Sequence, residues 1–322
     1  MPLTTDSKLL ALSREALDTF DKASGGVHSG FRPAHAKGVL LTGAFTPSLE
    51  AASLTRAPHM QRQSVPVTLR FSDFAGIPTV ADNGRDASPR GCAIRFHLAE
   101  HVHTDIVSHS VDSFPARTAE GLLALLNALI ATDPAGPQPN AIEQFLGAHP
   151  EALRFVQAPK PIPTSFARES FFGVSAFLFT NAKGASRYGR YRILPAAGNE
   201  YLDETAASAQ SPDFLFDEIE ERVRRAPIRF RLDVQLAESG DPVDDATIRW
   251  PESRALTTLG EISLTEIAPN NAAAQQQIIF DPIPRVDGIE ASADPLFEAR
   301  ANVYLMSGRR RRSAGTAAGA SH

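Results

Sequence analysis

The sequence predicts an α+β protein built on a closed antiparallel β-barrel with added helices. The clearest sign is the stretch IRFRLDVQL at 228–236, where apolar and polar residues alternate without a break. Alternation with a period of two indicates a strand with one buried face. Several other short apolar or alternating runs end in turn residues, and strong helical patterns lie between the groups of strands. Many strands with helical excursions favour a barrel.

The first half of the chain begins with an expected amphipathic helix at residues 7–23, where apolar residues recur at helical spacing. Strands are then expected in KGVLLTGAFT, VPVTLRFSDF, GCAIRFHLAE and TDIVSHS, because each is a short apolar or alternating run. Helices are expected at 119–132 and around AIEQFLGAHPEALRFVQ.

The second half begins after the proline-rich connector PKPIPTSF. The stretch FFGVSAFLFTNAKGASRYGRYRILP is expected to be a hairpin that turns at Asn181 to Gly184. The strand at 228–236 and a strand in GEISLTEIA follow it. No break in composition marks a second domain among the 322 residues. We therefore expect an N-terminal helix and arm at 1–30, one domain at 31–312 and a disordered tail at 313–322.

Composition argues against several functional classes. A net charge of -5 gives no sign of nucleic acid as the main partner. The basic run RRRR at 309–312 is typical of a solvated tail or a weak anion site. The single cysteine, Cys92, lies in an apolar run and is expected to be a buried small side chain. We expect no signal peptide, no transmembrane helix and a cytoplasmic location, or a periplasmic one if an export signal has been removed.

The last helix expected in the chain carries a tyrosine with an arginine one turn before it. In DPLFEARANVYLMSGRRRR, Asp294 can cap a helix whose first residue is Pro295. Arg300, Tyr304 and Arg311 then lie along one face of that helix. A nearby guanidinium favours the phenolate form of a tyrosine, and a phenolate is a hard donor suited to ferric iron. The alternative is a tyrosine packed on a helix beside a surface arginine.

His35 lies in FRPAHAKGVLLTGAFT, just before an expected strand. As a neutral imidazole it could take a proton from one oxygen of a peroxide and return it to the other. The alternative is a histidine that caps the end of the strand and hydrogen-bonds a carbonyl.

Three arginines in separate segments, Arg32, Arg70 and Arg311, are candidates for binding carboxylates, because a guanidinium can pair with a carboxylate through two hydrogen bonds. Arg70 is the most informative of them. It lies among apolar neighbours in VTLRFSDF, where an unpaired charge would be costly. A ligand with two carboxylates, such as haem with its propionates, would need such residues from distant parts of the chain.

The stretch HVHTD holds a His-x-His pair, His101 and His103, which a strand would place on one face as in many metal sites. No third ligand is obvious nearby, so a hairpin tip is expected there rather than a metal site. His109 has no role assigned from the residues alone.

Six blocks, in order from residue 32 to residue 312, together resemble the haem catalases, and in particular the branch of minimal catalases and catalase-related peroxidases. The blocks are RPAHAKGVLLTGAFT, VTLRFSDFAG, GRDASPRGCAIRFH, TDIVSHSVDSFP, FFGVSAFLFTNAKGASRYGRYRI and RANVYLMSGRRRR. The resemblance implies a catalase-like, eight-stranded antiparallel barrel core and haem b (iron protoporphyrin IX) as cofactor.

Residue roles carry over by position from this resemblance. Tyr304 matches the proximal iron ligand, and Arg300 matches the cation that keeps it a phenolate. His35 matches the distal acid–base group, with Ser72 at its other ring nitrogen. Ser110 falls where large catalases have an asparagine that helps to bind peroxide.

The remaining matches concern the cofactor edge and the route for peroxide. Arg32, Arg70 and Arg311 match the arginines that bind the propionates. Asp86 matches an acidic residue that lines the peroxide channel.

Two departures from large catalases shape the expected activity. The hydroxyl of Ser110 is shorter than an amide and donates one hydrogen bond, although the neighbouring His109 could fill the gap. The chain also ends soon after the proximal helix. We therefore expect a peroxidase with weak catalase activity, which reduces hydrogen peroxide or organic hydroperoxides with a small organic donor. The resemblance also implies a homodimer without bound NADPH.

Two alternatives remain open from the sequence. A hydroperoxide isomerase resembling allene oxide synthase would use the same iron ligation on a fatty-acid hydroperoxide. A β-barrel that binds haem without turnover would keep the arginines but would not need His35 paired with Ser72.

Overall fold

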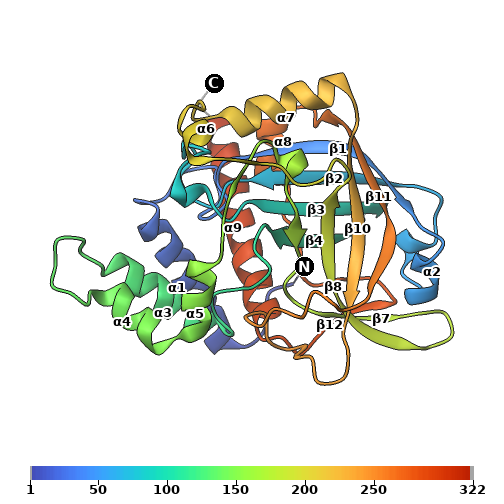
Figure 1. The fold of residues 1–322 in the computed structure, drawn as a ribbon, viewed down its shortest axis with the longest axis horizontal. Helices are drawn as coiled ribbons and strands as arrows, with labels where there is room; N and C mark the ends of the chain where they lie inside the picture. Colours follow the sequence, from blue (N-terminus) through green and yellow to red (C-terminus); the bar gives the residue numbers. More distant parts are fainter. Residues whose placement is uncertain (1, 320–322) are drawn as a thin grey trace.

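The computed structural model describes residues 2–319, and eight of its strands close into an antiparallel barrel (Figure 1). The strands are neighbours in the order β10-β11-β1-β2-β3-β4-β6-β8, and β8 pairs with β10 to complete the ring. Their bounds are β1 (Gly38–Pro47), β2 (Val65–Ser72), β3 (Gly91–Ala99), β4 (Val102–His109), β6 (Phe171–Phe172), β8 (Ser186–Pro195), β10 (Ile228–Leu236) and β11 (Leu256–Ile267). This confirms the predicted barrel core.

Four further strands lie outside this ring. The strands β7 (Phe177–Thr180) and β12 (Ile289–Ala291) extend the sheet beyond β8. The strands β5 (Ile162–Pro163) and β9 (Tyr201–Leu202) form a separate pair. The hairpin predicted to turn at Asn181 to Gly184 is formed by β7 and β8, and the backbone N–H of Gly184 donates to Asn181 O at 3.0 Å.

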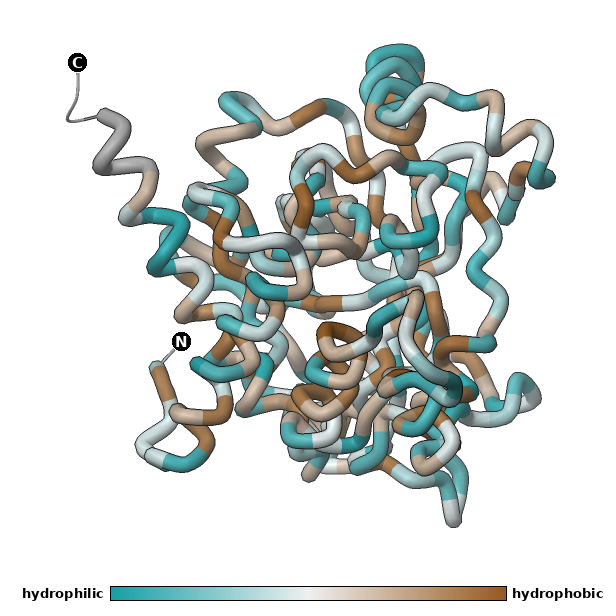
Figure 2. The backbone as a smooth tube through the Cα atoms, turned by 90° about the vertical axis from the view of Figure 1, so that its left-hand side faces the viewer, coloured by the Kyte–Doolittle hydropathy of each residue, from teal (hydrophilic) through white to brown (hydrophobic). Residues whose placement is uncertain are grey.

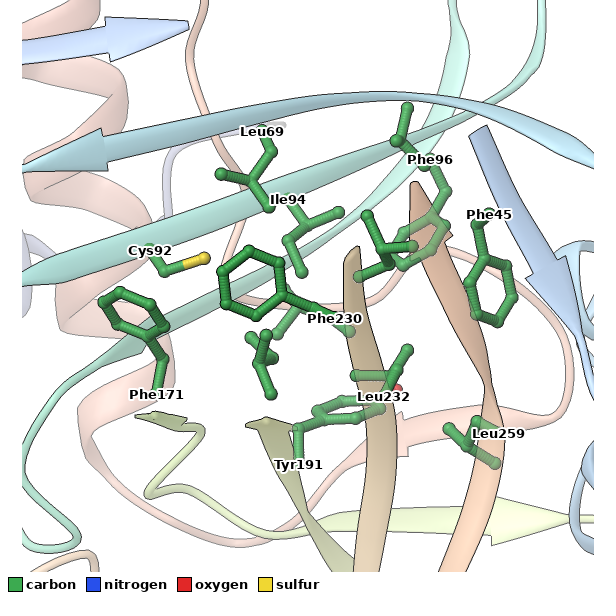
Figure 3. Close-up of a cluster of buried hydrophobic side chains, with 14 of the residues drawn as sticks. Phe45, Leu69, Cys92, Ile94, Phe96, Phe171, Tyr191, Phe230, Leu232 and Leu259 are labelled. Carbon is green, nitrogen blue, oxygen red and sulfur yellow. The ribbon is translucent and has the colours of Figure 1, made fainter. Parts of the chain in front are cut away.

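Apolar side chains fill the inside of the barrel. Figure 3 shows residues such as Phe96, Phe171 and Phe230 pointing toward one another from different strands. The alternation predicted for 228–236 appears in β10, whose five apolar side chains are all buried. The opposite face is only partly exposed, because Asp233 bonds Arg231 and Gln235 bonds Arg192. Since the interior is packed, a site for a large ligand must lie outside the barrel.

The helices lie outside the barrel. The longer ones are α1 (Ser7–Ala23), α3 (Ala119–Ile130), α4 (Ala141–Ala148), α5 (Pro150–Gln157), α7 (Phe214–Arg225), α8 (Asn271–Gln277) and α9 (Leu296–Gly319). The short ones are α2 (Ala51–Leu54) and α6 (Glu204–Ser208). Helix α9 lies between the barrel and the group formed by α1, α3, α4 and α5 (Figure 1). Polar and apolar residues alternate along the helices that face the viewer in Figure 2, as expected for helices that bury one side.

Most predicted elements appear close to their expected bounds, with three differences. The long helical pattern at 141–157 forms two helices, because Pro150 starts a new helix after the turn at His149. Helices α2, α6, α7 and α8 and the short strands β5, β9 and β12 were not predicted. The tail predicted for 313–322 begins inside α9, which runs to Gly319, and residues 320–322 lie outside the described residues. The division into an arm, one domain and a tail stays a prediction.

The sequence predicted a hairpin tip rather than a metal site at His101 and His103, and no transmembrane helix. His101 lies exposed at the β3–β4 turn, and no group of three or more histidine, cysteine or acidic side chains within residues 2–319 could hold a metal ion. In the same range, no helix has the length and apolar character needed to cross a membrane.

Candidate active site

His35 is held by the backbone in an uncommon conformation just before β1. Its φ angle is 58°, in the left-handed region that non-glycine residues rarely adopt. The backbone N–H of His35 donates to Phe74 O at 2.6 Å, and that of Ala36 donates to Ala75 O at 3.0 Å. These two bonds fix the segment against the chain that follows β2.

Ser72 contacts the ring of His35, as the sequence predicted. The distance from His35 Nδ1 to Ser72 Oγ is 3.1 Å, and the ring lies edge-on to Phe74 with 5.4 Å between centroids. The backbone of Asp73 also interacts with the ring and raises its pKa, and no side chain within residues 2–319 hydrogen-bonds His35 Nε2. One ring nitrogen is therefore oriented by Ser72, and the other remains available.

The imidazole of His35 is neutral at ordinary pH. The ring keeps some accessible surface, yet the surrounding protein desolvates it and lowers its pKa to about 3. The charges of Arg70, His109 and Arg32 add to this lowering. A neutral imidazole with a free nitrogen can accept a proton.

Gly91 lies against the His35–Ser72 pair, and the sequence analysis assigned it no role. The register pairs Ser72 of β2 with Gly91 of β3, and Gly91 with His109 of β4. A Cβ atom at position 91 would lie 2.5 Å from Ser72 Oγ and 2.8 Å from His35 Nδ1. Because real Cβ atoms do not approach so closely, a side chain there would displace the pair. The sequence block that contains Gly91 gave no sign of this contact, which depends on pairing between strands.

Helix α9 carries the predicted tyrosine and arginine on one face. Asp294 caps it, because Asp294 Oδ1 accepts from the backbone N–H of Leu296 at 2.9 Å. Arg300 Nε and Nη2 each lie 3.4 Å from Tyr304 Oη. About two turns beyond Tyr304 on the same face, Arg311 Nη1 donates to Ser307 Oγ at 2.8 Å. The expected face is therefore present, with the guanidinium of Arg300 at the phenol oxygen of Tyr304.

The three arginines from distant segments meet at the C-terminal end of α8. Arg32 donates to Gln275 O at 3.2 Å and to Ile278 O at 3.1 Å, and Arg311 donates to the same Ile278 O at 2.9 Å. Arg70 Nε donates to Gln275 Oε1 at 2.9 Å. Neither α8 nor Gln275 was predicted from the sequence, because they contribute neutral acceptors and carry no charge or motif.

The cluster of Arg32, Arg70 and Arg311 has no anionic partner in the described part of the chain. All of its hydrogen bonds go to backbone carbonyls, an amide or a hydroxyl, and Arg311 Nε is buried without any partner there. Burial lowers the pKa of Arg70 to about 9 and that of Arg311 to about 10, and it lowers the pKa of Arg32 well below its usual range. The cluster further lowers the pKa values of Arg32 and Arg70, because its positive charges repel one another.

A buried cluster of unpaired positive charges calls for a buried anion. Haem fits this requirement, because its two carboxylates can pair with the cluster and the phenol oxygen of Tyr304 is a suitable iron donor. The two parts of the site are joined by α9, which carries both Tyr304 and Arg311. Arg311 shares the acceptor Ile278 O with Arg32.

The other predicted site residues are placed less directly. Ser110 Oγ accepts from the backbone N–H of Arg90 at 2.9 Å. His109 Nδ1 accepts from the backbone N–H of Val111 at 3.3 Å, and its Nε2 is buried without a partner in the described residues. Asp86 is exposed on the 3-10 turn η2 (Arg85–Ala87), and no contact within residues 2–319 joins it to His35.

The basic run at 309–312 does not act as one unit, because the helix turns its four side chains in different directions. Arg309 is exposed, and Arg310 pairs with Asp21 of α1. Arg311 turns inward to the cluster, while Arg312 bonds Gln277 O at 3.0 Å.

The sequence also matches known proteins over most of its length. The sequence model of the catalase family matches residues 17–317. The chain is 34% identical to the catalase-related peroxidase of Mycolicibacterium paratuberculosis, over 91% of this chain and 92% of that protein. It is 32% identical to the catalase-related peroxidase of Synechococcus elongatus, over 88% of this chain and 84% of that protein.

Solved structures show the same fold. Catalase A from Saccharomyces cerevisiae superposes with a TM-score of 0.76 at 23% identity, covering 87% of this chain and 61% of that one. A fungal catalase gives a TM-score of 0.77 at 23% identity, covering 87% of this chain and 59% of that one. The chain therefore belongs to the catalase family, a family of haem-binding oxidoreductases, and is an enzyme of that kind.

Proposed function

We propose that the protein is a haem b peroxidase with weak catalase activity, which reduces hydrogen peroxide or organic hydroperoxides with a small organic electron donor. The observation that carries the proposal is the cluster of three arginines, which has no carboxylate partner within residues 2–319. The cluster shares α9 with Arg300 and Tyr304, and Arg70 bonds Ala36 O beside the neutral His35. The two relatives named as catalase-related peroxidases match nearly the whole chain and support it.

On the α9 side, the residues would hold the cofactor. Tyr304 would bind the iron through its phenol oxygen, and Arg300, at 3.4 Å from that oxygen, would favour the phenolate. Arg32, Arg70 and Arg311 would bind the two propionates. When bound, the haem would supply the iron that binds peroxide and the oxidising power that the donor then consumes.

On the His35 side, the residues would move a proton. For Nε2 to accept a proton from the peroxide, Nδ1 must carry one, and Ser72 Oγ at 3.1 Å can accept that hydrogen bond. His35 Nε2 would take the proton from one oxygen of the peroxide and deliver it to the other. The pKa of about 3 leaves His35 neutral and ready for this step.

Weak catalase activity is proposed from Ser110. A hydroxyl has one hydrogen to donate, so Ser110 could offer a peroxide one donated hydrogen bond, while its oxygen accepts from Arg90 N. Asp86, exposed on its turn, is proposed to line the mouth of the peroxide channel. Stopped-flow kinetics would test the balance of activities. Fast oxygen release from hydrogen peroxide, with no oxidation of an organic donor, would contradict the proposal.

The decisive experiment combines an absorption spectrum with two variants. The purified protein should show a strong Soret band with high-spin ferric features. We expect Tyr304→Phe to lose haem or its high-spin spectrum, and His35→Ala to retain haem while losing peroxide reactivity by about 100-fold or more, since the proton transfer is lost. Unchanged reactivity in His35→Ala would favour a haem-binding barrel without turnover. An isomerised product from a lipid hydroperoxide, formed without a donor, would favour a hydroperoxide isomerase.

We also propose a homodimer located in the cytoplasm, or in the periplasm if an export signal precedes the mature chain. Sedimentation analysis of the purified holoprotein would test the dimer, and a monomer at micromolar concentration would contradict it.

A further inference from the structure

Gln275 on α8 uses both polar atoms of its side chain and its backbone carbonyl, and two of its four contacts are with the arginine cluster. Its Oε1 accepts from Arg70 Nε at 2.9 Å, and its backbone O accepts from Arg32 Nη1 at 3.2 Å. Its Nε2 donates to Gly38 O at 2.8 Å and to Asn271 Oδ1 at 2.7 Å. The two donated bonds fix the direction of the amide, so Oε1 must face Arg70.

Gln275 is uncharged, and this affects the net charge of the arginine cluster. A carboxylate at the same place would form an ion pair with Arg70 and cancel part of the positive charge of the cluster. An amide oxygen accepts the same hydrogen bond and leaves the charge intact. The other acceptors in the cluster are also neutral: Ile278 O receives Arg32 and Arg311, and Ala36 O receives Arg70 at 3.2 Å.

We propose that Gln275 is a positioning residue that holds Arg70 and Arg32 in place without neutralising them, and so reserves their charge for the carboxylates of the ligand. The inference rests on the proposed function, in which that ligand is haem. The competing explanation is that Gln275 only joins α8 to β1 through Gly38 O and stabilises the fold there.

The test compares how fast holoprotein variants release haemin to a large excess of apomyoglobin. Gln275→Met removes all side-chain hydrogen bonds and adds no charge. Gln275→Glu keeps the acceptor at Arg70 but adds a negative charge. Gln277→Glu is the matched control, because it adds the same charge to an exposed position on the same helix.

The same variants are also loaded with haemin dimethyl ester, which carries no carboxylates. We expect Gln275→Glu to release haemin about tenfold faster than Gln275→Met, because its carboxylate competes with the propionates for Arg70. With the dimethyl ester the two variants should release at similar rates. Gln277→Glu should behave as wild type with both ligands.

Several results would overturn the inference. Equal release of haemin from the Glu and Met variants would show that charge at position 275 is irrelevant. Loss of folding in Gln275→Met, seen as a missing thermal transition, would show that joining α8 to β1 is the main role of the residue. If only Gln275→Glu fails to fold, Gln275→Met decides: faster release of haemin but not of its ester supports the inference, and an equal effect on both overturns it.

Failure of the proposed function would look different. In that case the wild-type protein would not retain haemin at all, whereas failure of the inference alone leaves wild-type retention intact and removes only the difference between the variants.

Discussion

His35 keeps its left-handed backbone conformation because its neighbours hold it there. A non-glycine residue at φ 58° costs energy, and such strain persists only where the surroundings compensate. The compensation comes from the hydrogen bonds of residues 35 and 36 to Phe74 O and Ala75 O. The position of the ring is therefore set by the backbone pairing of two segments and then refined by Ser72.

Substitution of Gly91 tests whether a small displacement of the His35 ring lowers the rate of reaction with peroxide. In Gly91→Ala the new Cβ would collide with Ser72 Oγ and His35 Nδ1, so the pair must move. We expect the variant to retain haem and to lose about 100-fold in the rate of reaction with peroxide, since a displacement of about 1 Å can cost that much. Stopped-flow measurement of the peroxide reaction at equal haem content checks this. A wild-type rate would show that the ring tolerates displacement.

At this scale, the charged and titratable residues were predicted from the sequence, and so was Ser72 beside His35, but two other residues that position them were not. Arg70 was predicted as a ligand-binding residue because a lone charge among apolar neighbours needs a partner. Gly91 and Gln275 were not predicted, since one acts by lacking a side chain and the other by being neutral. Such roles depend on which segments meet in space, and a single sequence does not show this directly.

Among the elements, α9 determines the layout of the site. Its helical repeat places Arg300, Tyr304 and Arg311 on one face, and the same repeat separates the four consecutive arginines at 309–312. That face was predictable, because it follows from spacing within one helix. Helix α8 was not predictable in the same way, because NAAAQQQ carries no apolar periodicity and its importance comes from contacts with β1 and α9.

Gly308 of α9 gives a prediction in which two effects have opposite signs. Replacing a glycine inside a helix by alanine usually stabilises it by about 1 kcal/mol. At position 308, however, a Cβ would lie 2.3 Å from both Cδ1 and Cγ1 of Ile279, a stiff β-branched side chain. We expect Gly308→Ala to lower the free energy of unfolding by about 1 to 3 kcal/mol through overpacking. Urea unfolding would measure it.

Gly147→Ala is the control for this variant. Gly147 lies inside α4, and a Cβ there would meet no atom within 4 Å. The Gly147→Ala substitution should raise the free energy of unfolding by up to about 1 kcal/mol. If both variants were stabilised, the close packing of α9 against Ile279 would be wrong.

For the whole molecule, the packed barrel decides where chemistry can occur. Its interior is filled by aromatic and aliphatic side chains, so the charged cluster, His35 and Tyr304 gather on the outside, between the strands β1 to β4 and the helices α8 and α9. The predicted barrel and its patterning followed from alternation along each strand. A closed barrel was predicted, but which strands close it could not be derived from alternation, because the pairing of β8 with β10 joins segments far apart in the sequence.

The fold also buries histidine and carboxyl side chains, and these two kinds of group change the stability with pH in opposite directions. Burial lowers the pKa values of His35 and His109 to about 3 and that of His59 to about 4. The native state therefore holds these rings neutral while the unfolded state binds protons below pH 6.5, so stability falls as the pH falls. Burial raises the pKa values of Asp73 and Glu169, and the stability they contribute is lost as the pH rises.

The contribution of a single buried histidine to the pH dependence of stability can be measured at His59, which lies away from the cluster of arginines. Its ring is buried against Phe96, with 4.9 Å between centroids, and Nδ1 has no partner in the described residues. His59→Leu removes the group that must stay neutral in the native state. Between pH 7 and pH 5 the variant should lose about 2 kcal/mol less stability than wild type, the amount expected for a pKa of 4 in the native state and 6.5 in the unfolded state.

Urea unfolding at both pH values, followed by the fluorescence of the buried Trp250, measures this difference. Met60→Leu is the matched control, because Met60 is the buried neighbour in the same segment and does not titrate. It should keep the pH dependence of wild type. If His59→Leu kept it as well, the ring of His59 would have to be hydrated or protonated in the native state, and the buried neutral histidine inferred here would be wrong.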